Sequence, residues 1–243
     1  MIACNYLANA IPFNGLTQRD LSAHYQIFLT PAGYVFSIWG LIYLGLTFYV
    51  VTQARSRYLD HPGIRELDLP FTLSCLCNMF WLVVWHYLYL TLSVILMLGL
   101  LTSLIWIYLK IDQRLDLDIK SGPELPWLIK RTFSVYLGWV SLATILNIAI
   151  WLYVHSWEGG PISPQSWAVI LLGAAGVLFH YLGITKRDAA VLGVLAWASL
   201  GIGLKHQAES MIAITSGVIC IMSLVTAFWI SATARRGATE LEI

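Results

Sequence analysis

The apolar stretch from Phe133 to Tyr153 carries side chains that could bind a ligand. Tyr136, Trp139, Ala143 and Asn147 follow one another at intervals of three or four residues, so in a helix they lie along one face. An unpaired polar group in hydrocarbon costs several kcal/mol, so a helix surrounded only by lipid would not carry an asparagine at mid-depth. We therefore expect this face to meet other helices, a cavity or a ligand. The small Ala143 beside the Trp139 indole leaves room for a flat molecule.

Two further apolar stretches place a tryptophan beside a polar side chain. Trp39 and Tyr43 are four residues apart in one stretch, and Asn78 precedes Trp81 by three residues in the next. Ordinary core packing explains each tryptophan singly. Three helices that each offer an indole and a polar partner favour a binding pocket between them.

The sequence offers no recognisable catalytic machinery. No Asp or Glu lies inside an apolar stretch, and because proton- and cation-coupled transporters usually need an intramembrane acid, coupled transport is disfavoured. The chain contains no Ser-His-Asp set, no Gly-rich phosphate loop and no His/Cys cluster at metal-ligand spacing. Cys75 and Cys77 are two residues apart, so a helix points them away from each other. We therefore expect a binding protein without a catalytic or metal site, rather than an enzyme.

His180 lies inside the apolar stretch 167–183 and allows two interpretations. The favoured one is a packing histidine that is hydrogen-bonded to a neighbouring helix. The alternative is an axial ligand for the metal of a tetrapyrrole.

The composition requires an all-α, polytopic integral membrane protein to position these residues. Of 243 residues, 58% are hydrophobic and 11% are charged, whereas a soluble domain carries about 25% charged residues. A helix rises ~1.5 Å per residue and must cross a hydrocarbon core of about 30 Å. The sequence predicts a short apolar segment over 1–11, followed by seven full spans. These are 34–51, two spans from the run 70–111 that folds back at 88–91, then 133–153, 167–183, 189–204 and 211–231.

The basic residues predict the orientation. If both termini are cytoplasmic, all of the 14 Lys and Arg residues except Arg19 and Lys205 lie on the cytoplasmic side, as the positive-inside rule favours. The mixed segment 16–30 then lies at the outer surface. We expect the protein in the cell (inner) membrane or in another internal energy-transducing membrane. The net charge of +1 and the absence of a basic run give no indication of a nucleic-acid partner.

Three motifs occur along the first two-thirds of the chain. Asn78-x-x-Trp81 is one, and the segment Tyr136–Asn147 is another. The motif that precedes them, Thr30–Leu46, contains Pro31, Gly33, Tyr34, Phe36, Trp39, Leu41 and Tyr43. Thr30–Leu46 resembles the second-helix signature of the TspO/MBR family, the tryptophan-rich sensory or translocator proteins. Asn78-x-x-Trp81 resembles the third-helix signature of that family, and Tyr136–Asn147 resembles the fifth-helix signature. The resemblance covers residues 1 to about 155, and the last three spans are similar to those of longer tryptophan-rich sensory proteins.

The resemblance implies a TspO-like five-helix bundle over residues 1–155, with a short first helix, and three additional transmembrane helices over 156–243. Family members bind porphyrins, and in some cases sterols, in a pocket formed by helices one, two, three and five, with the first loop as a lid. Carried onto this chain, it implies that the segment 16–30 covers the outer mouth of a tetrapyrrole site. Trp39 and Trp139 would stack on or flank the ligand; Asn78, Asn147 and Tyr43 would bond its polar edge; Trp81 and Tyr136 would complete the lining; and Ala143 would leave clearance.

The chain departs from the family pattern at four positions. Val135 replaces the proline before the fifth-helix tyrosine, Val83 replaces a third-helix proline, and Trp85 and His86 replace a pair of phenylalanines. These changes favour a cavity that is shaped for a different ligand.

Two other functions stay open. The protein could be a structural or regulatory subunit of a larger, pigment-containing membrane complex, with its aromatic residues used for helix packing. A secondary transporter is the third alternative. As partners we expect the lipid bilayer, a hydrophobic small molecule, and either a second copy of the chain or another membrane protein.

Overall fold

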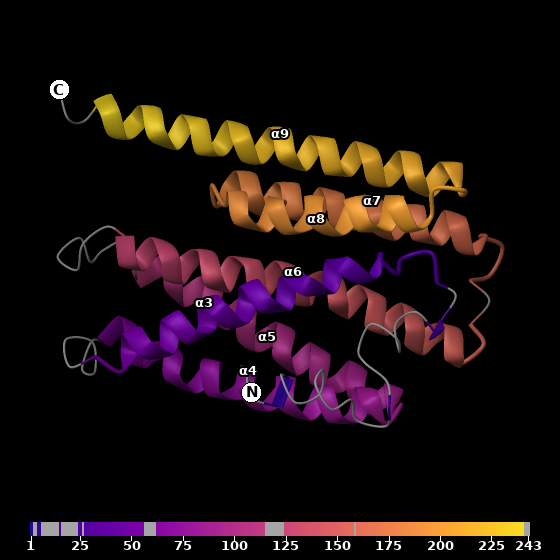
Figure 1. Cartoon of the computed structure of the whole chain (residues 1–243), viewed down its shortest axis with the longest axis horizontal. Coiled ribbons are helices and arrows are strands. Elements are labelled where there is room, and N and C mark those ends of the chain that lie inside the picture. The colour runs from indigo at the N-terminus through magenta and orange to yellow at the C-terminus, as the bar shows by residue number, and fades with distance from the viewer. Residues whose placement is uncertain are drawn as a thin grey trace. The chain divides into compact units, whose positions relative to one another are not determined.

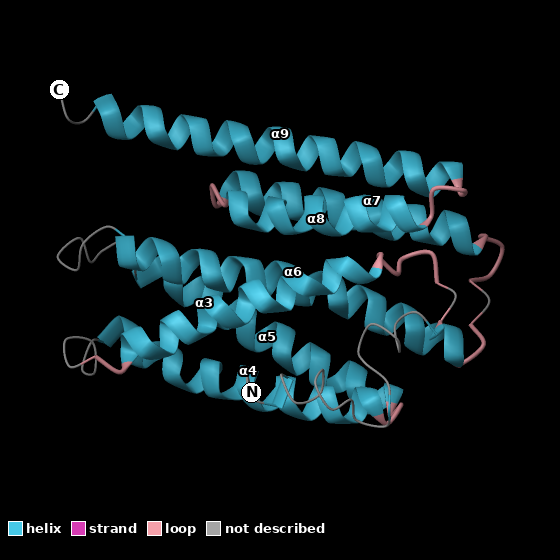
Figure 2. Cartoon of the chain, viewed as in Figure 1, coloured by secondary structure: helices cyan, strands magenta, loops and turns pink. Residues whose placement is uncertain are grey.

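The computed structural model describes residues 1, 4–5, 15, 24–25, 27–55, 62–114, 124–157 and 159–240. Every regular element within these residues is helical (Figure 2). A short 3-10 helix, η2 (Gly33–Ser37), precedes seven α-helices. These are α3 (Ile38–Gln53), α4 (Pro62–His86), α5 (Leu90–Arg114), α6 (Glu124–Val154), α7 (Pro164–Thr185), α8 (Ala189–Lys205) and α9 (Ser210–Glu240).

The chain divides into two compact units. The first unit comprises Met1–Tyr25 and Phe36–Trp151, and the second comprises Gln26–Val35 and Leu152–Ile243. The first therefore contains α3, α4, α5 and most of α6, and the second contains α7, α8 and α9 (Figure 1). The ten residues that precede Phe36 belong to the second unit, although α3 belongs to the first.

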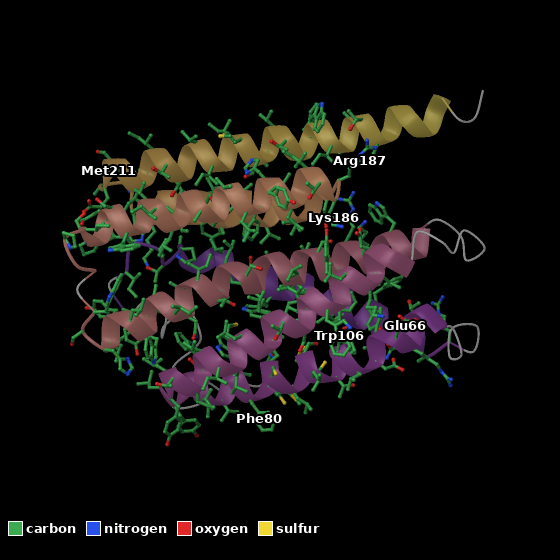
Figure 3. All side chains as sticks on the ribbon, turned by 180° about the vertical axis from the view of Figure 1, so that it is seen from behind. Glu66, Phe80, Trp106, Lys186, Arg187 and Met211 are labelled. Atoms are coloured by element: carbon green, nitrogen blue, oxygen red, sulfur yellow. The ribbon has the colours of Figure 1, made fainter. Side chains whose placement is uncertain are left out.

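The helices have the length and apolarity of membrane spans. Six of the described helices are long and apolar enough to cross a bilayer, and α8 is a shorter apolar helix of 17 residues. Large apolar side chains such as Phe80, Trp106 and Met211 are 58%, 42% and 57% exposed on the helix surfaces, as expected for contact with lipid (Figure 3). The prediction of an all-α, multi-pass membrane protein is confirmed. The predicted short first helix lies, except for residues 1, 4 and 5, outside the described residues.

The fold-back in the long apolar run is also confirmed. Helix α4 ends at His86 and α5 begins at Leu90. Leu88 adopts a left-handed backbone conformation in the turn between them, with φ of 60°. This conformation is uncommon for a residue with a Cβ atom, and it reverses the chain within three residues.

Two helices begin earlier than their apolar stretches predict. Helix α4 starts eight residues before Pro70, and α6 starts nine residues before Phe133. Their extra turns mix apolar with charged residues, and they carry one end of each of two ion pairs to α5. Lys110 of α5 lies 2.9 Å from Glu66 of α4, and Asp112 of α5 lies 3.1 Å from Lys130 of α6. Hydropathy predicts the part of a helix that lies in lipid. Helices α4 and α6 extend beyond that part, so their first turns were not predicted.

Aromatic contacts join α3, α4 and α6 near the start of α6. The Tyr49 ring meets the Phe71 and Phe133 rings edge to face, with centroids 5.0 and 5.1 Å away. A Cβ on Gly45 would lie 2.6 Å from Thr132 Oγ1, so only glycine permits this approach of α3 to α6. Successive helices reverse direction, so α4 and α6 are parallel and α3 is antiparallel to both (Figure 1). The beginning of α3 therefore lies toward the far ends of α4 and α6.

The second unit is an up-down-up arrangement of α7, α8 and α9. Ser163 caps α7 by accepting a hydrogen bond from Ser166 N at 3.2 Å, and Pro164 is the first helical residue. Asp188 caps α8 by accepting from Ala190 N at 3.0 Å. Lys186 and Arg187, in the turn between α7 and α8, lie at the opposite end of this unit from Met211 (Figure 3).

Residues 27–35, which we call the strap, pack on the C-terminal half of α8. Ala32 N donates to Gly201 O at 3.0 Å, and Trp197 Nε1 donates to Val35 O at 3.0 Å. At the helix end, the Lys205 ammonium donates to Thr30 Oγ1 at 2.7 Å. Of the segment 16–30 that was predicted to cover the site, residues 27–30 lie in this strap, and residues 16–23 and 26 lie outside the described residues.

Candidate functional site

An aromatic cluster lies between the start of α3 and the middle of α6. The Trp39 and Tyr43 rings are stacked, with centroids 5.5 Å apart and an interplanar angle of 17°. Trp39 also meets Tyr136 at 6.0 Å and Trp139 at 6.2 Å, both edge to face, and Phe36 meets Trp139 at 5.8 Å. The structure thus brings together four predicted site residues, and it adds Phe36. We call these five residues the aromatic cluster.

A chain of buried hydrogen bonds ties this cluster to α4 and to the N-terminal residues. Asn5 Nδ2 donates to Asn78 Oδ1 at 2.8 Å, and Asn78 Nδ2 donates to Tyr136 Oη at 3.2 Å. All three side chains are fully buried. Tyr136 Oη also lies 3.8 Å from Met1 Sδ. Asn78 therefore positions α4 against α6 in this structure.

The sequence interpretation did not include Asn5. A signal was available, because an asparagine in an apolar segment such as 1–11 needs a buried partner. The identity of that partner, Asn78, depends on a contact between residues 73 positions apart.

Three buried hydrogen-bond donors near the cluster have no partner among the described residues. They are the Tyr43 hydroxyl and the indole N–H groups of Trp81 and Trp139. Each unsatisfied buried donor costs about 1–3 kcal/mol. An indole N–H can only donate, so the two tryptophans lack an acceptor. The site is therefore suited to a ligand that brings acceptor atoms.

The two indoles lie at corresponding levels of parallel helices. Trp81 follows Asn78 by three residues on α4, and Trp139 follows Tyr136 by three residues on α6. Each is one turn beyond the hydrogen bond that joins Asn78 to Tyr136. Trp81 is 5% exposed and stacks on Trp85, with centroids 5.9 Å apart.

The remaining predicted residues lie farther along α6 or in the second unit. Ala143 is one turn beyond Trp139 and is half-buried. Asn147 accepts a hydrogen bond from Ser93 Oγ of α5 at 3.1 Å, so its amide connects α6 to α5. His180 lies on α7, where its Nδ1 donates to Gly176 O at 2.8 Å.

Comparison with known proteins extends the match beyond the predicted range. A family model described as "TSPO-like protein" matches residues 1–229. The matched range includes α7, α8 and most of α9, which the motifs alone did not cover. No curated protein and no solved structure matches the chain.

Proposed function

Because this chain belongs to the family of TSPO-like proteins, we propose that it is a membrane-embedded binding protein for a flat hydrophobic ligand of the porphyrin or related tetrapyrrole class. The proposed site is the aromatic cluster together with the Trp81 indole. The observation that supports it is the set of three unpartnered donors on α3, α4 and α6, beside stacked and edge-on aromatic rings.

The chemistry of the donors favours a particular kind of ligand. Tyr43 Oη, Trp81 Nε1 and Trp139 Nε1 would donate to acceptors on the ligand, such as carboxylate or carbonyl oxygens. The surrounding rings offer apolar, flat surface, which suits stacking on an aromatic macrocycle. A porphyrin combines both features, since its ring is flat and its propionate groups are acceptors.

The partnered residues would have a different role from the donors. Asn78 and Tyr136 already bond to each other, and Asn147 already bonds to Ser93. We assign them to holding α4, α5 and α6 in register around the site. Trp39 and Trp139 would flank the ring of the ligand, and Ala143 would leave clearance beside it.

Porphyrin titration of single tryptophan variants tests the proposal. In nanodiscs, protoporphyrin IX should bind the wild type saturably, as followed by the porphyrin absorption and by quenching of intrinsic fluorescence. Trp139→Phe keeps a ring but removes the N–H donor, so it should weaken binding by roughly two- to tenfold, the equivalent of about 0.5–1.5 kcal/mol for one hydrogen bond. Trp81→Phe should act in the same direction.

Trp106→Phe is the matched control, because Trp106 is 42% exposed on α5. It should bind porphyrin like the wild type. Equal affinities for the wild type and all three variants would exclude the cluster as the porphyrin site.

A further inference from the structure

The second unit contains unpartnered polar groups of its own. Four buried side-chain atoms have no hydrogen-bond partner among the described residues: Nε2 of His180 on α7, Oγ of Ser199 on α8, and Oγ of Ser216 and of Ser223 on α9. The three serines are 1%, 0% and 0% exposed. One such atom in a native bundle is ordinary, but four in three helices need an explanation.

Ser216 and Ser223 lack a hydrogen bond that other serines in the described helices make. A serine in a helix usually bonds back to the carbonyl one turn before it, as Ser103, Ser141 and Ser231 do at 2.8–2.9 Å. Ser216 and Ser223 do not make this bond, although Ser231 does so on the same helix. Their hydroxyl groups are therefore available to another partner.

The contacts between helices indicate where these atoms lie inside the unit. Gly176 of α7 faces α9, because a Cβ built on it would lie 3.5 Å from Ile219 Cδ1. Helices α7 and α9 are parallel, and His180 and Ser223 each lie one turn beyond that contact on the same helix faces. Ser216 faces α8 at Gly203, whose added Cβ would lie 3.2 Å from Ser216 Cβ. Ser199 lies one turn before Gly203 on the same face of α8. The four polar atoms thus extend over about two helical turns of the interior of the unit.

The tautomer of His180 follows from its backbone bond. Its Nδ1 contacts Gly176 O at 2.8 Å, and a carbonyl oxygen can only accept, so Nδ1 carries the proton. In the neutral ring, Nε2 then carries a lone pair, and it meets no donor among the described residues. It requires a hydrogen-bond donor.

The size and charge of the occupant can be inferred from the surroundings. Gly176 and Gly203 sit in contact with Ile219 and Ser216 of α9, so the helices approach too closely for a large ring between them. Within the described residues no group of three or more His, Cys, Asp or Glu could hold a metal ion. The carboxylates nearest in sequence, Asp188 and Glu209, lie outside the spans. The occupant is therefore small and uncharged.

We propose that α7, α8 and α9 enclose a hydrated polar site, in which ordered water bonds to His180 Nε2 and to the hydroxyl groups of Ser199, Ser216 and Ser223. Water both donates and accepts, and each buried molecule makes about three hydrogen bonds. Because Ser216 and Ser223 are about 10 Å apart along α9, more than one water molecule is needed to reach all four groups. The site is separate from the aromatic cluster and does not depend on porphyrin binding. It gives the second unit a hydrated proton acceptor at membrane depth.

Solid-state NMR of the full chain in lipid bilayers tests the proposal directly. With ¹⁵N-labelled histidine, magnetisation from water should reach the His180 ring, whose signals are assigned by their loss in His180→Gln. The triple variant Ser199→Ala/Ser216→Ala/Ser223→Ala should reduce this transfer several-fold. A His180 ring that receives none from water in the wild type would overturn the proposal.

Thermal unfolding gives an independent test. Removal of a serine hydroxyl group should change Tm differently if that group binds water than if it is unsatisfied. If the hydroxyl groups bind water, Ser216→Ala and Ser223→Ala should lower Tm by more than the control Ser231→Ala, whose hydroxyl bonds only its own helix. If the hydroxyl groups are unsatisfied, removing them takes away a buried polar atom. An unchanged or raised Tm would then reject bound water at these positions.

Discussion

At the scale of single residues, buried polar groups in the first unit occur in two states. Asn78 is bonded on both sides, by Asn5 and by Tyr136, whereas Trp139 Nε1 has no acceptor among the described residues. The first state stabilises the bundle, and the second leaves a site ready for a ligand at a cost in stability. Residue type alone does not distinguish them, because an asparagine and a tryptophan on one helix face can be in either state.

The asparagine pair should be energetically coupled. Asn78→Leu removes one acceptor of the Asn5 amide and the donor to the Tyr136 hydroxyl, so it should lower the free energy of unfolding by about 2 kcal/mol or more. Asn5→Leu should also destabilise the protein. The double variant should be less destabilised than the sum of the two, with a coupling of about 1 kcal/mol.

Unfolding in a mild detergent, followed by circular dichroism, measures this cycle. Thr102→Val serves as the control, because the exposed Thr102 hydroxyl bonds only to carbonyls of its own helix. Strict additivity of the two asparagine substitutions would show that the bond between them contributes nothing.

At the scale of the elements, the sequence predicts apolar spans well and long-range contacts poorly. The turn before Leu90 and the cap at Ser163 follow from local patterns, because hydropathy, helix length and capping depend on neighbouring residues. The early start of α4 at Pro62 does not, since charged residues interrupt the apolar pattern in its first turns. The hydrogen bond between Asn147 and Ser93 could not be predicted either, because the residues on one helix face do not specify which neighbouring helix will pack against that face.

The strap gives a test at this scale. A Cβ on Gly201 would clash with the Val35 side chain, so Gly201→Ala should displace the strap from α8 and destabilise the protein by about 1–3 kcal/mol. Gly193 lies on the same helix with nothing near its added Cβ. Gly193→Ala should be neutral or stabilising, by up to about 1 kcal/mol, because alanine favours a helix over glycine.

Hydrogen–deuterium exchange of the full chain in nanodiscs distinguishes the two variants. Faster exchange at the Ala32 amide is expected in Gly201→Ala alone, since that amide bonds to Gly201 O. Unchanged protection in Gly201→Ala would mean that close packing at this glycine does not hold the strap.

At the scale of the whole molecule, the family match over residues 1–229 crosses both compact units. The predicted division of the chain into two domains, residues 1–155 and 156–243, stays a prediction. The second unit includes residues from before α3, so a cut near residue 159 would remove the α8 partners of the strap from the N-terminal piece.

The orientation in the membrane is open to direct measurement. Pro161 and Arg187 are both exposed, at opposite ends of α7. If the basic residues determine the topology, Pro161→Cys should react with an impermeant maleimide in intact cells, and Arg187→Cys should react only after permeabilisation. The four native cysteines are replaced in both variants. The reverse pattern would place both termini outside.

The contact between the strap and α8 can form only late during synthesis of the chain. Thr30 is 175 residues from Lys205 in the chain, so its partner does not exist when the strap leaves the ribosome. At a translation rate of roughly 5–20 residues per second, the delay is on the order of ten seconds or more. Throughout this interval Thr30 has neither Lys205 nor His206 to bond. The nascent chain therefore completes this contact only after α8 has been made, and any ribosome that stops before Gly201 releases a protein whose strap has no α8 surface to bind.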